Sequence, residues 1–124
     1  MKPETVIIVS RVSRADRLLA RSRLKPSVLF IACCDRLMAR RGVVVEMPAL
    51  AQRVLTMLIV ADGCPVAVAE IIAVAYGDDP RGGPEFAEVS IRKAILEARA
   101  AGAALGVAVT TAALGYSARI VEAA

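Results

Sequence analysis

The sequence contains no histidine and no tryptophan, and its aromatic residues are limited to two tyrosines and two phenylalanines. Without histidine the chain lacks the usual general base at neutral pH and the commonest metal ligand in proteins. It also has neither a G-x-S-x-G nucleophile motif nor a Walker-type phosphate loop. We therefore expect no enzymatic activity, no cofactor and no metal.

Cysteine is also scarce. Cys33 and Cys34 are adjacent and Cys64 stands apart, so the three cannot all form disulfides and do not have the C-x2-C spacing of a zinc site. We interpret them as small buried hydrophobic residues. For the adjacent pair, a reactive or metal-binding role is the alternative.

Long apolar runs are absent as well. The longest are residues 28–34 and 66–75, the second interrupted by Glu70, whereas a membrane-spanning helix needs about 20 apolar residues. The apolar run at 6–9 is followed by Arg11 and Arg14, which does not fit the continuous hydrophobic region of a signal peptide. We expect a cytoplasmic protein with one core, built mainly from Ala, Val, Leu and Ile.

The net charge of +4 hides an uneven distribution along the chain. Residues 1–41 carry ten Lys or Arg against three acids, whereas residues 42–124 carry six against nine. A basic segment before a compact domain can follow DNA phosphates as an arm, because each neutralised phosphate releases counterions. The sequence therefore predicts a basic N-terminal segment at 1–41 and a separate domain at 42–124.

The basic segment is expected to be largely helical. Ser13 and Asp16 resemble a capping box for a short helix at 13–24, and Pro26 ends it. Two interpretations stay open for its cations: an arm that contacts DNA, or a solvated helix face. For residues 28–41 a helix is preferred, although the apolar run at 28–31 would equally suit a buried strand. The cations proposed for the arm are Arg11, Arg14, Arg17, Arg21, Arg23 and Lys25.

Residues 42–101 predict a short strand followed by three helices. A β-branched run at 43–45 indicates the strand, and apolar residues at helical spacing predict helices near 48–61 and 68–76. Gly77 ends the second of these helices. After a turn-rich loop, Pro84 and Glu85 are typical of the first turn of a third helix, which is expected to end near Ala101.

The third helix has two different faces. An Ile/Ala stripe should pack on the first two helices, and it consists of Ala87, Ile91, Ala94, Ile95 and Ala98. The opposite face is available to a partner and presents Phe86, Val89, Ser90, Lys93, Leu96 and Glu97, with Arg92 and Arg99 beside it. Alternating residues at 107–111 and 116–121 then predict a β-hairpin. The expected fold class is α+β.

The order of these signals resembles the winged helix-turn-helix effector domain of response regulators, in particular its stand-alone, phage-like members. The resemblance covers about residues 42–122. The segments that carry it are Gly63-Cys64-Pro65-Val66, Glu70-Ile71, Tyr76-Gly77-Asp78-Asp79-Pro80, Gly83-Pro84-Glu85, Ile91-Arg92, Ala98-Arg99 and the stretch from Thr111 to Tyr116.

The resemblance implies a three-helix core with a C-terminal hairpin wing and a role as a DNA-binding transcriptional regulator. The third helix would enter the major groove, the wing would lie along the neighbouring minor groove, and the loop between Gly77 and Pro84 would contact RNA polymerase. Dimerisation is common in such proteins, so a homodimer is one of the states open to this chain. The DNA-binding residues expected are Val89, Ser90, Arg92, Lys93, Glu97, Arg99, Thr111 and Tyr116.

The sequence departs from the family pattern at the tip of the wing. Ala112, Ala113 and Leu114 stand where family members usually have an Arg or Lys. The domain at 42–124 is also acidic overall, and duplex DNA repels such a domain unless its cations cluster locally. The alternative hypothesis is therefore a winged-helix module for protein contacts, with RNA polymerase or another regulator as partner, that uses an apolar stripe on the third helix.

Overall fold

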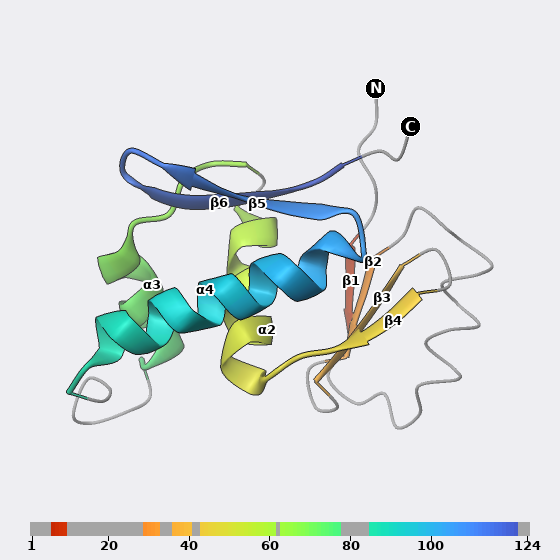
Figure 1. The fold of residues 1–124 in the computed structure, drawn as a ribbon, viewed down its shortest axis with the longest axis horizontal. Coiled ribbons are helices and arrows are strands. Elements are labelled where there is room, and N and C mark those ends of the chain that lie inside the picture. Colours follow the sequence, from red (N-terminus) through yellow and green to blue (C-terminus); the bar gives the residue numbers. More distant parts are fainter. Residues whose placement is uncertain are drawn as a thin grey trace.

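The computed structural model describes residues 6–9, 29–32, 36–40, 43–61, 63–77 and 85–121. These residues form three helices and two β-sheets, which confirms the α+β class (Figure 1). The helices are α2 (Ala49–Val60), α3 (Val68–Ala75) and α4 (Ala87–Ala103). The strands are β1 (Val6–Val9), β2 (Leu29–Ala32), β3 (Leu37–Arg40), β4 (Val43–Glu46), β5 (Val107–Ala112) and β6 (Gly115–Ile120).

The helix preferred for residues 28–41 is wrong, because this stretch forms strands β2 and β3. Leu29, Ile31 and Met38 are fully buried, and Ile31 lies opposite Met38 across the ladder. A short apolar run has the same pattern in a buried strand and in a buried helix, so only the pairing decides between them. The helix expected at 13–24 and the cysteines at 33 and 34 lie outside the described residues. The burial expected for Cys64 is wrong, because this residue is exposed in the segment between α2 and α3.

The first sheet has the strand order β1-β2-β3-β4. Strand β1 pairs with β2 in parallel, and the other two pairings are antiparallel. The β-branched run expected to form a strand is β4, and its Val45 lies opposite Met38 of β3. The predicted strand is therefore correct, and its partner comes from the basic segment.

The three predicted helices are present, with ends close to those expected. Helix α2 begins after Pro48, where a proline costs no hydrogen bond, and ends at Val60, with Ala61 as its C-cap. Ala67 precedes α3 and Phe86 precedes α4, and neither residue supplies a side-chain cap. Packing must therefore hold these two N-termini. None of the described helices is long and apolar enough to cross a membrane.

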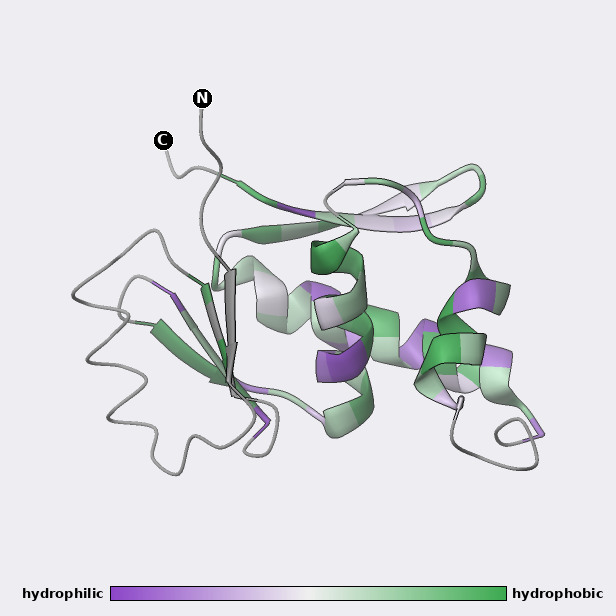
Figure 2. Ribbon diagram, turned by 180° about the vertical axis from the view of Figure 1, so that it is seen from behind, coloured by the Kyte–Doolittle hydropathy of each residue, from purple (hydrophilic) through white to green (hydrophobic). Residues whose placement is uncertain are grey.

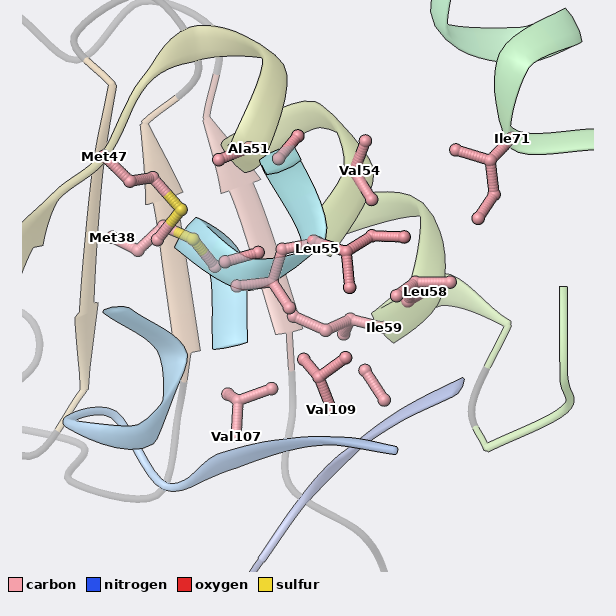
Figure 3. Packing of buried hydrophobic residues seen from close by; sticks show 14 of the residues in the cluster. Met38, Met47, Ala51, Val54, Leu55, Leu58, Ile59, Ile71, Val107 and Val109 are labelled. Carbon is pink, nitrogen blue, oxygen red and sulfur yellow. The ribbon is translucent and has the colours of Figure 1, made fainter. Parts of the chain in front are cut away.

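One hydrophobic core joins the first sheet, the helices and the hairpin. Figure 3 shows Met38 of β3 beside Met47, and Val107 and Val109 of β5 directed toward Ile59 of α2. Seen from behind, hydrophobic residues run along much of α2 and α3 (Figure 2).

Two buried polar side chains connect the elements around this core. Gln52 of α2 donates a hydrogen bond from Nε2 to the carbonyl oxygen of Leu37 at 3.0 Å. Arg40 of β3 donates from Nη1 to the carbonyl oxygen of Leu105 at 3.0 Å. Because Leu105 lies between α4 and β5, the second bond fixes the first sheet against the base of the hairpin.

The predicted hairpin is formed by β5 and β6, which pair from Val107↔Ile120 to Ala112↔Gly115. It lies along one side of α2 and α4 in Figure 1. Val66, in the short segment between α2 and α3, forms an isolated bridge to Tyr116 of β6. The hairpin is therefore attached to the rest of the protein along β6 as well as at its base.

Candidate nucleic-acid interface

Helix α4 separates a buried face from an exposed one. Its Ile91 and Ala98 are fully buried and Ala94 and Ile95 are 1% exposed, which confirms the expected Ile/Ala stripe apart from Ala87, which is partly exposed. At 100° per residue the opposite face must point away from the core. The side chains on that face are therefore available to a partner.

We call the exposed face of α4 the outward stripe. Its members lie within about 80° of one another around the helix axis, and all are exposed. They are Phe86, Val89, Lys93, Leu96 and Ala100. The large apolar members are 61–68% exposed, and Lys93 lies in the middle as the only cation of the stripe. Ser90 and Glu97 are partly buried on one flank of the stripe.

On the other flank, Arg92 connects α4 to the hairpin. Its guanidinium donates to Oε2 of Glu88 at 2.8 Å and 3.1 Å and to the hydroxyl oxygen of Tyr116 at 3.1 Å. The hydrogen bond to Glu88 raises the pKa of Arg92, and the electrostatic influence of Tyr116 raises it further. Arginine is protonated at any pH a cell meets even without these contacts. Its side chain is still 53% exposed.

Arg99 holds the hairpin two turns further along α4. It donates from Nε to the carbonyl oxygen of Val109 at 3.2 Å and from Nη2 to the hydroxyl oxygen of Thr111 at 3.1 Å. Strand β5 has no strand partner on its side away from β6 among the described residues. Arg99 thus satisfies an edge carbonyl that would otherwise be open to another strand.

The far side of the hairpin is held by Val66. Its backbone N–H donates to the carbonyl oxygen of Tyr116 at 2.7 Å, and the N–H of Tyr116 donates back at 3.0 Å. Gly115 makes this approach possible, because a Cβ atom there would collide with the Val66 carbonyl group. The hairpin is therefore fixed between α4 and the segment before α3.

No family model matches the chain, and no curated protein matches it.

The eight expected DNA-binding residues fall into two groups. Four of them hold the hairpin against α4: Arg92, Arg99, Thr111 and Tyr116. The others lie on or beside the outward stripe: Val89, Ser90, Lys93 and Glu97. The structure thus brings all eight to one side of α4 or to its seam with the hairpin. DNA binding by either group stays a prediction.

The other predicted contacts lie mostly outside the described residues. None of the arm cations, Arg11, Arg14, Arg17, Arg21, Arg23 and Lys25, is described, and neither is the loop at 78–84 beyond Gly77. At the wing tip Leu114 is 81% exposed. Two other cations of the basic segment are described: Arg36 lies 3.4 Å from Glu46, and Arg40 is buried.

Sequence reasoning missed Glu88 and Arg40. The spacing of four residues between Glu88 and Arg92 is a known signal for an ion pair on one helix face, so that contact could have been found. No local signal marks Arg40, because its acceptor at Leu105 is 65 residues away. Among the described residues, no group of three His, Cys, Asp or Glu could hold a metal ion.

Proposed function

We propose that this chain is a DNA-binding transcriptional regulator of the winged helix-turn-helix type. Helix α4 enters the major groove of duplex DNA, and the β5–β6 hairpin serves as the wing on the adjacent backbone. The observation that carries the proposal is the geometry of α4: one face is buried, the opposite face is exposed with Lys93 at its centre, and a fixed hairpin lies beside it.

Size and rigidity support this proposal. A helix with its side chains is about 10–12 Å across, and the major groove is about 12 Å wide. Arg92 and Arg99 fix the hairpin to the helix before any DNA arrives. The two elements therefore need little reordering to meet a duplex, and preorganisation of this kind favours binding.

The distribution of charge indicates which part of the chain attracts the DNA phosphates. Between residues 85 and 103, Arg92, Lys93 and Arg99 are balanced by three glutamates. The helix alone therefore attracts phosphates weakly. The ten Lys and Arg of residues 1–41 give the full chain its positive charge, and we propose that the cations from Arg11 to Lys25 serve as an arm on the DNA backbone.

The regulator acts in the cytoplasm, and the loop between Gly77 and Pro84 contacts RNA polymerase.

The salt dependence of DNA binding tests the proposal. We expect the full chain to bind unrelated duplexes with an affinity that falls linearly with salt on a log-log plot. Lys93→Gln should reduce the magnitude of that slope by about 0.9, which is the value for one lost phosphate contact. Arg36→Gln is the matched control, because it removes the same charge from an exposed turn just before β3 and should leave the slope unchanged.

One observation favours a second function, a module for protein contacts. Phe86, Val89 and Leu96 are large apolar side chains that are more than half exposed on one helix face, and such faces commonly bind other proteins. In this case the chain should bind purified RNA polymerase without DNA, and Leu96→Ser should weaken that complex. A chain that binds polymerase but no duplex would replace the first proposal with this one.

A further inference from the structure

The outward stripe has an unusual composition for a DNA-reading surface. The side chains that usually read adenine in the major groove are Asn and Gln. The chain contains no asparagine, and its single glutamine, Gln52, is buried in α2 and bonded to Leu37. Adenine therefore has no bidentate partner on α4 or the hairpin.

Guanine recognition is also limited. Guanine is read by Arg or Lys that donate to its O6 and N7 atoms. Arg92 and Arg99 already donate to Glu88, Tyr116, Val109 and Thr111. Lys93 is the only cation of the outward stripe, and its neighbours on the helix face are Val89 and Leu96 on one side and the polar Ser90 and Glu97 on the other. Apart from the partly buried Ser90 and Glu97 on its flank, this surface thus has few hydrogen-bonding groups that distinguish base pairs.

What the stripe does offer is apolar contact. The only apolar group that a base pair presents in the major groove is the C5-methyl group of thymine. Val89 and Leu96 are 65% and 61% exposed on the same side of α4. Leu96 lies seven positions after Val89, a rise of about 10.5 Å along the helix axis, which matches about three steps between base pairs. Each can therefore meet a methyl group while Lys93 lies between them.

We infer that this protein recognises thymine methyl groups in the major groove through Val89 and Leu96, and so prefers duplexes rich in A·T pairs. The inference rests on the proposed function, since α4 must occupy the major groove. Lys93 supplies affinity by contacting a phosphate, and the two apolar side chains supply the preference.

Replacing thymine by uracil tests this inference, because it removes the methyl group and leaves the hydrogen-bonding groups of the base pair unchanged. The full chain is titrated with a short duplex of alternating adenine and thymine and with its uracil counterpart. Burial of one methyl group contributes about fourfold in affinity, so two contacts should give a preference of about fifteenfold for the thymine duplex. A guanine·cytosine duplex should gain affinity when its cytosines carry a 5-methyl group.

Three variants assign the effect to residues. Val89→Ala and Leu96→Ala should each lower the thymine-to-uracil ratio by about fourfold, and both sites are exposed, so the fold should persist. Lys93→Gln is the matched control, which should weaken binding to both duplexes and leave the ratio unchanged. Equal affinity for the thymine and uracil duplexes would overturn this inference alone. Failure to bind any duplex would overturn it together with the proposed function.

Discussion

Gly115 decides how closely the hairpin approaches the segment before α3. The carbonyl group of Val66 occupies the space that a Cβ atom at position 115 would need. A side chain there must separate Val66 from Tyr116, which breaks the two backbone hydrogen bonds between them. Gly115 thus controls whether the wing is held in place.

We expect Gly115→Ala to lower the free energy of unfolding by about 2–3 kcal/mol, because it combines a backbone collision with the loss of two hydrogen bonds. Thermal or urea denaturation measures this change. Ala113→Gly, at an exposed neighbouring turn position, is the control and should change stability by about 1 kcal/mol at most. If Gly115→Ala were as stable as the unmodified chain, the close approach of Val66 would be wrong.

At the residue scale, the sequence predicts which side chains are buried better than it predicts their hydrogen-bond partners. Helical spacing correctly placed Ile91, Ile95 and Ala98 in the core, because burial on one helix depends on local periodicity. The same residues gave no indication that Arg99 would bond to Val109 and Thr111. Those contacts depend on the position of the hairpin. The spacing of apolar residues within α4 carries no information about that position.

At the scale of elements, α4 and the hairpin form one unit because Arg99 joins them. We expect Arg99→Met, which keeps the length of the side chain but removes its donors, to loosen β5 without unfolding the core. Two lost, partly exposed hydrogen bonds correspond to about 1 kcal/mol, or roughly fivefold faster amide hydrogen exchange in the hairpin.

Lys93→Met is the matched control for this variant. It lies on the same helix but on the outward stripe, so hairpin exchange should stay at the rate of the unmodified chain. Amides of α2 should keep their protection in both variants. Equal exchange in Arg99→Met and Lys93→Met would mean that Arg99 does not hold the hairpin.

The elements of residues 43–121 were predicted more reliably than those before them. Prolines, glycines and long helical periods mark the ends and types of α2, α3 and α4. The strands β2 and β3 have only four residues each, too few for a period of two to be told from a helical one. Their identity follows from pairing with each other and with β1 and β4, which is a tertiary property.

At the scale of the whole molecule, the first sheet and the helices share a core. Leu29, Ile31 and Met38 come from residues before 42 and are fully buried in the same cluster as α2 and β5. We expect a chain that begins at Gly42 to lose cooperative unfolding, because this apolar surface would lie open to water. Calorimetry of the shortened and full chains checks this. An unchanged, cooperative transition in the shortened chain would show that residues 42–124 fold independently.

In the proposed function, the outward stripe of α4 is the surface that meets DNA. The most direct test is to follow the backbone amide signals of the full chain by nuclear magnetic resonance while duplex DNA is added. We predict that the largest shifts occur at residues 86–100, with a second group on the hairpin near residues 110–116. Shifts confined to other elements, or no shifts with any duplex, would contradict the assignment of α4 to the major groove.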